Sequence, residues 1–347
     1  MIDPVKLRRR LDEVWTLLSQ DASAAGHEVM RACALTLIAV IDEDGGADSA
    51  AQVLAELMRG HPSRTILVRL TAGSGGELEA DVDARCWMPL GGRQQICSEQ
   101  IVIRASEATL GEIPGVLLPL IVPDLPVVLF CPSLRGWRSP AFAALAAPAG
   151  RLILDTFLAP QPLEALTAVL AQNQLHHALL TDLSWTRLTR WRALLAQVFE
   201  NELYRAQIRR FTEAVVQYEG ADALRLPPTC LLLAGWLASR LGWTPEQARS
   251  QLRFEHLPAD QPAGKLDGFA LAAPGEPAVR ISIRRCGASS AEVRVEMGRS
   301  EPVMNRVALA PSDPVLLLGE ELGIRAADPI FAESLERAVL LGRLLAS

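Results

Sequence analysis

The chain has 347 residues, of which 50% are hydrophobic and 21% are charged, and its formal net charge is −6. This length exceeds that of an average domain, so we expect two domains with a substantial apolar core. The acidic balance excludes a sequence-wide attraction for nucleic acid or for an anionic membrane, because phosphate binding needs a clustered positive field.

The amino terminus and the cysteines predict a soluble, cytoplasmic protein. Arg8, Arg9 and Arg10 lead directly into Leu11, without an apolar stretch of signal-peptide length. The most apolar segments are interrupted by prolines or are shorter than the about 20 residues that a membrane-spanning helix needs. The six cysteines form no CxxC pair and have no zinc-ligand spacing, so we expect six reduced, mostly buried thiols.

The first half of the chain alternates between strand patterns and helix patterns. The predicted elements are an amphipathic helix over 4–18, a buried strand over 32–41, a helix over 50–58 and a buried strand over 64–70. A strand–helix–strand unit of this kind indicates neighbouring parallel strands. The alternating segments 78–88 and 96–103 flank Gly91-Gly92 and predict an antiparallel hairpin.

The second half continues this alternation and then changes character. Further strands are predicted at 127–130, 152–154, 178–180, 214–218, 279–283, 292–297 and 302–307, and further helices at 141–146, 163–170, 183–199, 231–241 and 332–345. We therefore predict an α/β fold with a mixed sheet and flanking helices in residues 1–185. Residues 186–347 are predicted to form a smaller α+β module.

The sequence carries no catalytic or cofactor-binding signature. The GxGxxG, GxxxxGK[ST], GxSxG and HExxH motifs are all absent from it. The adjacent pair His176-His177 is a poor metal site, because neighbouring strand positions point to opposite faces of a sheet. We therefore expect neither a cofactor nor a metal.

The predicted hairpin pairs Cys86 with Cys97 if its loop consists of Gly91-Gly92 alone. On this register the two cysteines are expected to form a hydrogen-bonded, wider pair, which favours two packed thiols over a disulfide. A redox switch at Cys86 and Cys97 is the alternative that stays open.

The segment from Asp182 to Arg192 is the most distinctive in the chain. Asp182 is placed to cap a helix, and Trp185, Arg187, Trp191 and Arg192 follow it. Tryptophan and arginine together are typical of interface anchors. A core tryptophan flanked by solvated arginines is the equally simple alternative.

A set of segments, taken in order, resembles one known family. The segments are RACALTLI (31–38), HPSR (61–64), EQI (99–101), LPLIVPDLPV (118–127), DLSWTR (182–187), WR (191–192) and LAGWLASRLGW (233–243). The chain is similar to the OpcA family, the glucose-6-phosphate dehydrogenase assembly proteins of actinobacteria and cyanobacteria. The resemblance implies a protein that binds glucose-6-phosphate dehydrogenase, supports its assembly or activity, and performs no reaction itself.

Two interpretations follow for individual residues. In the first, Trp185, Arg187, Trp191 and Arg192 contact the dehydrogenase, and His61, Arg64 and Asp124 are further candidate contacts. In the second, the protein is an enzyme acting on a sugar phosphate, with His61, Arg64 and Asp124 brought together at the strand ends, where α/β sheets usually bind ligands.

Overall fold

The computed structural model describes most of the chain. The described residues are 2–24, 26–45, 47–73, 78–89, 94–132, 134–139, 141–175, 178–260, 264–309, 312–324 and 326–346. No helix among these residues is both long enough and apolar enough to cross a bilayer.

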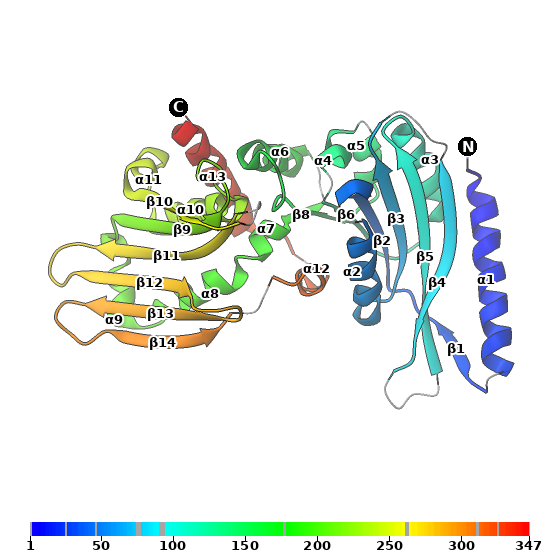
Figure 1. The fold of residues 1–347 in the computed structure, drawn as a ribbon, viewed down its shortest axis with the longest axis horizontal. Coiled ribbons are helices and arrows are strands. Elements are labelled where there is room, and N and C mark those ends of the chain that lie inside the picture. The colour runs from blue at the N-terminus through cyan, green and yellow to red at the C-terminus, as the bar shows by residue number, and fades with distance from the viewer. Residues whose placement is uncertain are drawn as a thin grey trace. The chain divides into compact units, whose positions relative to one another are not determined.

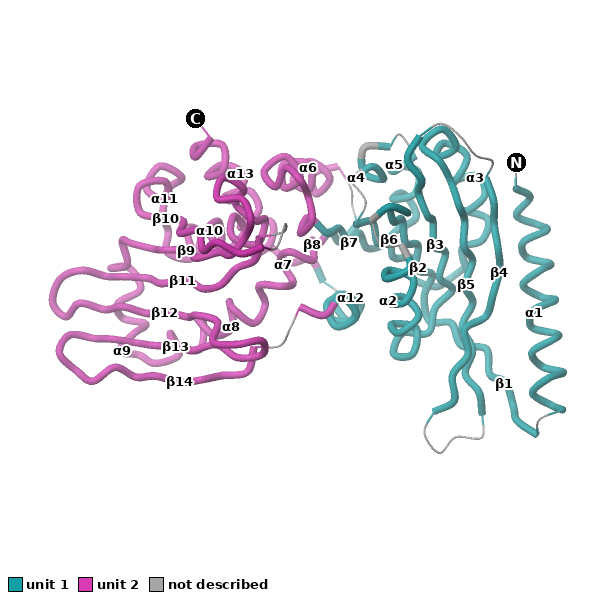
Figure 2. Tube along the Cα trace, in the orientation of Figure 1, with its two compact units in different colours: residues 1–155, 176–180, 314–326 teal, residues 156–175, 181–313, 327–347 magenta. Residues whose placement is uncertain are grey.

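The chain folds into two compact units that share its length almost equally (Figure 2). Unit 1 comprises residues 1–155, 176–180 and 314–326, and unit 2 comprises residues 156–175, 181–313 and 327–347. The observed division therefore differs from the predicted single boundary after residue 185. The reason is that the chain returns to a unit that it has already left, which no local pattern reveals.

Unit 1 is built on an eight-stranded sheet, with the order β1-β5-β3-β2-β6-β7-β8 and with β4 paired to β5. The strands are β1 (Glu28–Arg31), β2 (Leu35–Asp42), β3 (Ser63–Thr71), β4 (Glu79–Trp87), β5 (Gln94–Ser106), β6 (Val127–Cys131), β7 (Arg151–Leu154) and β8 (Leu179–Asp182). β2 is parallel to β3 and β6, whereas β4 is antiparallel to β5. This arrangement confirms the predicted parallel unit and mixed sheet; the turn at Gly91-Gly92 lies outside the described residues.

The helices of unit 1 cover both faces of this sheet. They are α1 (Pro4–Ala24), α2 (Ala47–Gly60), α3 (Ile113–Leu117), α4 (Leu134–Arg138), α5 (Ala141–Ala146) and α12 (Pro314–Gly323), with 3₁₀ turns at Glu43–Gly45, Leu110–Glu112 and Leu118–Leu120. α1 packs on β4 and β1, α2 packs on β2 and β3, and the two helices lie on opposite sides of the sheet (Figure 1). Coverage of both faces explains why the central strands are almost continuously apolar.

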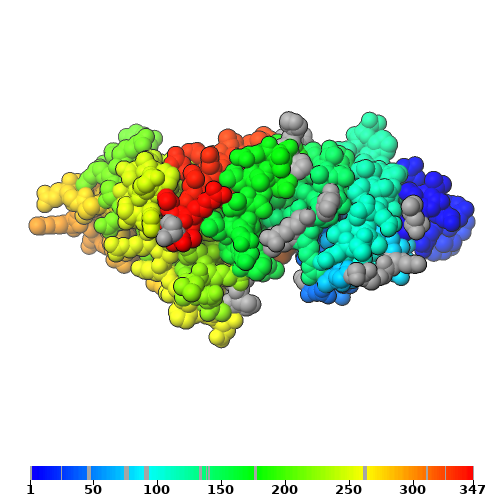
Figure 3. Space-filling view, turned by 90° about the horizontal axis from the view of Figure 1, so that it is seen from above, coloured from blue at the N-terminus to red at the C-terminus, as the bar shows by residue number. Residues whose placement is uncertain are grey.

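The long amphipathic helix α1 agrees with the sequence pattern. Leu7 and Leu11 are buried against the sheet, while Arg8, Arg9 and Arg10 are exposed. In the space-filling view α1, coloured blue, lies on the surface of unit 1 (Figure 3). Its charged face therefore meets solvent, as the spacing predicts.

Unit 1 is completed by α12, which comes from the carboxy-terminal part of the chain and packs on α2. Arg151 of β7 forms a buried ion pair with Glu321 of α12, and its Nη1 donates to the carbonyl oxygen of Ile324 at 2.5 Å. Both charged side chains are almost fully inaccessible to water. A buried pair of this kind fixes the position of α12 in unit 1.

Unit 2 contains a six-stranded sheet with the order β10-β9-β11-β12-β13-β14. The strands are β9 (Glu213–Gly220), β10 (Leu252–Pro258), β11 (Lys265–Ala273), β12 (Val279–Arg285), β13 (Ser290–Met297) and β14 (Val303–Ala308). β9 and β10 are parallel, and the other neighbours are antiparallel. The predicted strands at 214–218, 279–283, 292–297 and 302–307 are confirmed, whereas β10 and β11 were not predicted.

One face of this sheet is covered by helices. The helices of unit 2 are α6 (Pro162–Leu175), α7 (Leu183–Thr186), α8 (Thr189–Val198), α9 (Glu202–Arg205), α10 (Pro228–Leu241), α11 (Pro245–Gln251) and α13 (Pro329–Ala346), with a 3₁₀ turn at Ile208–Arg210. α10 packs on β9 and β11 and also on α13, and nearly all of its residues are buried. It ends at Gly242, whose φ of 74° makes a left-handed cap of the kind that favours glycine.

Candidate functional site

Asp182 anchors the segment that the sequence singles out. It ends β8 and caps α7, and its Oδ1 accepts hydrogen bonds from the backbone N–H groups of Ser184 at 2.9 Å and Thr156 at 3.1 Å. Its Oδ2 accepts a hydrogen bond from the Thr156 hydroxyl at 2.6 Å. The predicted cap is confirmed, and these bonds set the direction in which the following tryptophan and arginine residues leave the strand.

The two tryptophans of this segment lie in the core of unit 2. Trp185 is 2% exposed, its Nε1 donates to Asp328 Oδ2 at 2.8 Å, and its ring centroid lies 5.6 Å from that of Phe331. Trp191 is 3% exposed and lies 6.3 Å from the ring of Phe269 in β11. This burial agrees with the alternative interpretation, in which the tryptophans belong to the core, and a contact of Trp185 and Trp191 with a partner stays a prediction.

The two arginines are more accessible than the tryptophans. The guanidinium of Arg192 lies 3.5 Å from the centroid of the Trp185 ring, and that of Arg187 lies 4.5 Å from the centroid of the Phe157 ring. Both arginines are half-buried, so one face of each guanidinium packs on an aromatic ring. Arg187 and Arg192 therefore remain the candidate contacts of this segment.

The predicted helix over 183–199 is in fact two helices. α7 ends at Thr186 and α8 begins at Thr189. Arg187 and Leu188 form the break between them. Sequence periodicity did not reveal this break, because no proline or glycine marks it.

Arg64 belongs to a buried charge cluster in unit 1. Its Nε donates to Glu99 Oε2 at 2.5 Å and its Nη1 to the carbonyl oxygen of Leu120 at 2.8 Å. Glu99, which is 2% exposed, also pairs with Arg31 and accepts a hydrogen bond from Trp15 Nε1 at 2.7 Å. Glu99 thus pairs with Arg64 and Arg31 at once, and these contacts hold Arg64 in place inside unit 1.

His61 and Asp124 lie near the starts of β3 and β6, at the amino-terminal ends of these parallel strands. His61 faces α12, because a Cβ added to Gly319 would lie 3.5 Å from its Nε2. Asp124 occupies an exposed turn with a φ of 64°. In the described part of the chain, no hydrogen bond or ion pair joins His61, Arg64 and Asp124, and open α/β sheets bind ligands at the opposite, carboxyl ends of their strands.

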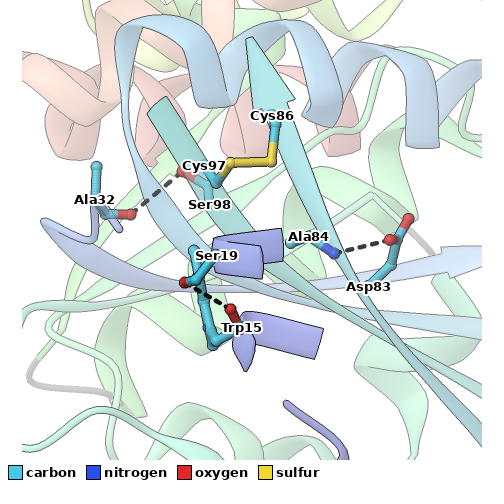
Figure 4. Close-up of a disulfide and its surroundings, with 8 residues drawn as sticks. All are labelled: Trp15, Ser19, Ala32, Asp83, Ala84, Cys86, Cys97 and Ser98. Carbon is cyan, nitrogen blue, oxygen red and sulfur yellow. Dashed lines mark hydrogen bonds between the residues drawn. A yellow bond between two sulfur atoms is a disulfide. The ribbon is translucent and has the colours of Figure 1, made fainter. Parts of the chain in front are cut away.

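Cys86 and Cys97 are joined by a disulfide between β4 and β5 (Figure 4). The register pairs Cys86 with Cys97 as predicted, but the disulfide corrects the expectation of two packed thiols. Their Cα atoms are 4.0 Å apart. This separation is closer to the about 4.5 Å of a non-hydrogen-bonded pair than to the about 5.5 Å of the wider pair that we expected.

We predict that protein purified without reductant has four titratable thiols after unfolding, and six after reduction, because Cys33, Cys131, Cys230 and Cys286 form no disulfide bond. Replacing both Cys86 and Cys97 by serine is expected to lower the free energy of unfolding by about 3 kcal/mol, since the bond closes a loop of short sequence separation. Thiol titration and denaturant unfolding measure the two effects.

The control is Cys33→Ser, which changes one half-buried free thiol and leaves the crosslink intact. Cys230 is unsuitable, because burial raises the pKa of its thiol and any substitution there also disturbs the core. Six titratable thiols in unreduced, unfolded protein would contradict the crosslink.

The described residues contain no group of three or more histidine, cysteine, aspartate or glutamate side chains that could hold a metal ion. His176 and His177 lie outside the described residues.

Family models match both parts of the chain. Residues 54–171 match the glucose-6-phosphate dehydrogenase subunit N-terminal domain, and residues 178–335 match the corresponding C-terminal domain. Together these matches cover well over half of the sequence. The chain belongs to the OpcA family.

Curated relatives agree with this assignment. A protein of Nostoc punctiforme named as the OxPP cycle protein OpcA is 30% identical over 199 residues, which cover 56% of this chain and 41% of the relative. The protein of the same name from Synechocystis sp. is 29% identical over 188 residues, covering 53% of this chain and 38% of the relative. The matched region thus spans about two fifths of the length of these relatives.

Solved structures align over most of the chain at low similarity. Biliverdin reductase from Synechocystis sp., in complex with biliverdin and NADP+, has a TM-score of 0.47 and 13% identity, covering 89% of this chain and 98% of that chain. The transcriptional regulator Gal80p from Kluyveromyces lactis has a TM-score of 0.43 and 10% identity, covering 94% of each chain. At these scores neither structure assigns a function.

Proposed function

We propose that this protein is a non-catalytic partner of glucose-6-phosphate dehydrogenase, which binds the enzyme and supports its oligomeric assembly or its activity in the oxidative pentose phosphate pathway. One observation carries this proposal: two consecutive segments match domains that are described as parts of a glucose-6-phosphate dehydrogenase subunit. The named role of the cyanobacterial relatives in the OxPP cycle supports it. We place this activity in the cytoplasm, in line with the composition.

The charged residues of unit 1 favour a structural role over catalysis. Arg64 is held by Glu99 and by a backbone carbonyl, which favours a structural role for its guanidinium. His61 faces α12, and Asp124 lies in an exposed turn, so neither side chain converges with Arg64 on one site. The alternative, a sugar-phosphate enzyme with its site at His61, Arg64 and Asp124, is therefore less well supported than the partner role.

Mixing this protein with glucose-6-phosphate dehydrogenase from the same source is expected to give a complex of larger mass and altered activity. Light scattering after size exclusion measures the mass, and NADPH formation measures the activity. The isolated chain is expected to turn over no sugar phosphate. A mixture that contains only the separate proteins, at unchanged activity, would contradict the proposal.

Arg192→Ala is expected to weaken this complex about tenfold, because half-buried arginines stacked on aromatic rings are frequent anchors of protein interfaces. The matched control is Arg280→Ala, which removes an exposed arginine of β12 in the same unit. Unchanged melting temperatures show that both variants fold. If the two folded variants bind glucose-6-phosphate dehydrogenase with equal affinity, Arg192 is not part of the contact surface.

A further inference from the structure

Unit 2 contains a cavity of about 580 Å³ next to the Trp–Arg segment. Its lining includes Phe157, Arg187, Trp191, Thr229, Asp267 and Arg285. The volume lies within the range of small-molecule binding sites. All of the lining residues belong to unit 2, so the cavity is a property of that unit alone.

A β-bulge directs one of the carboxylates at this cavity. The pairing of β11 with β9 shifts between Leu266 and Gly268, which leaves Asp267 without a partner on β9. A Cβ on Gly268 would lie 2.7 Å from the carbonyl oxygen of Ile283, so only glycine fits beside the bulge. Bulges redirect side chains and are frequent next to functional sites, and here the redirected side chain is a buried acid.

The charges around the cavity leave a positive surplus. The carboxylate of Glu219 is paired with Lys265 at 2.9 Å, and that of Asp267 is paired with Arg284 at 3.3 Å. Arg285 has no carboxylate partner within the described residues. Its guanidinium lies 5.6 Å from the centroid of the Trp191 ring, and its Nε is buried without a hydrogen-bond partner there.

A buried hydroxyl in the cavity wall also lacks a strong hydrogen-bond partner. Thr229, at the start of α10, is 4% exposed, and the thiol of the neighbouring Cys230 is the one weak partner of its hydroxyl among the described residues. Buried polar groups are almost always paired, and an unpaired one costs stability. A polar ligand in the cavity would supply the missing partner.

We infer that this cavity binds a small phosphorylated polyhydroxy compound of the size of a sugar monophosphate. The guanidinium of Arg285 matches the geometry of a phosphate group. The Thr229 hydroxyl and the Asp267 carboxylate are the groups that hydrogen-bond sugar hydroxyls. The Trp191 ring supplies an apolar surface for the carbon skeleton.

This inference does not rest on the proposed partner role, because the cavity is present in the isolated chain. Isothermal titration of the full chain with glucose 6-phosphate tests it, with inorganic phosphate and glucose as partial ligands. We expect one saturable site, with glucose 6-phosphate bound more tightly than either partial ligand. Dehydrogenase is absent from this experiment, so its outcome does not decide the partner proposal.

Arg285→Ala is expected to weaken the binding of glucose 6-phosphate at least about tenfold, since it removes a charge-assisted contact. Thr229→Val is expected to weaken glucose 6-phosphate binding severalfold and to leave inorganic phosphate binding unchanged. Arg280→Ala, on the same strand as Arg285 but outside the cavity lining, is the matched control and is expected to bind as the unaltered protein does.

Three results would overturn the inference: no saturable binding to the unaltered protein, equal losses in Arg285→Ala and Arg280→Ala, or affinity for glucose 6-phosphate no higher than for inorganic phosphate. If the melting curve shows that Arg285→Ala does not fold, Arg285→Lys replaces it. Lysine keeps the positive charge but lacks the two parallel N–H donors of a guanidinium. The Arg285→Lys variant is therefore also expected to bind glucose 6-phosphate more weakly than the unaltered protein does.

Discussion

Gly235→Ala is expected to lower the free energy of unfolding of unit 2 by about 3 kcal/mol or more. Gly235 lies in α10 where this helix crosses α13, and an added Cβ would collide with the carbonyl oxygen of Ser334 and lie 2.7 Å from the backbone nitrogen of Ala338. Both neighbours are backbone atoms of a helix, so neither moves without displacing α13. Denaturant unfolding followed by circular dichroism measures the loss.

The matched control is Gly115→Ala in α3, where an added Cβ meets nothing within 4 Å. Alanine also has the higher helix propensity, so this change is expected to be neutral or to stabilise slightly. Equal stabilities of the two variants would show that α10 and α13 are farther apart in solution than in this structure.

Glu321→Ala is expected to lower the free energy of unfolding of unit 1 by about 3–5 kcal/mol. The substitution leaves the guanidinium of Arg151 buried without its carboxylate, and Arg151 Nε already has no hydrogen-bond partner among the described residues. The loss is expected to appear as early unfolding of α12. Hydrogen exchange of residues 314–324 measures the local unfolding of α12, and denaturant unfolding measures the loss in the free energy of unfolding of unit 1.

Two further variants isolate the cause. Glu13→Ala removes one partner of the exposed Arg9–Glu13 pair of α1 and is expected to cost well under 1 kcal/mol. The double substitution Arg151→Met with Glu321→Leu removes both buried charges and is expected to recover most of the stability. A double variant as unstable as Glu321→Ala would show that packing around α12, rather than the unpaired charge, is responsible.

The parts of the fold that were predicted are those in which burial has a simple period. The central strands β2 and β3 are covered on both faces, so their sequences are continuous apolar runs. By contrast, β11 contains Gly268, a bulge and several alanines, which hide the alternation that identifies a strand. β10 follows α11 directly and carries charged residues on its exposed positions, so its limits were not recognisable either.

The candidate site was predicted only in part, for a related reason. Asp182 was recognisable as a cap because it accepts a hydrogen bond from the backbone N–H of Ser184, only two positions further along the chain. The burial of Trp185 was not, because Asp328 and Phe331 come from α13 and the residues before it, more than 140 positions away. The cavity also depends on groups that only the fold brings together, such as Phe157, Thr229 and Arg285.

The interleaving of the two units has a consequence for any attempt to divide or exchange them. The carboxy-terminal part of the chain first gives α12 to unit 1 and then gives α13 to unit 2. A chain that ends shortly before residue 314 therefore lacks α12 of unit 1 and α13 of unit 2 at the same time. A single recombination point therefore cannot exchange one unit without dividing the other. Loss of the carboxy-terminal residues also affects unit 1, which contains most of the first half of the chain.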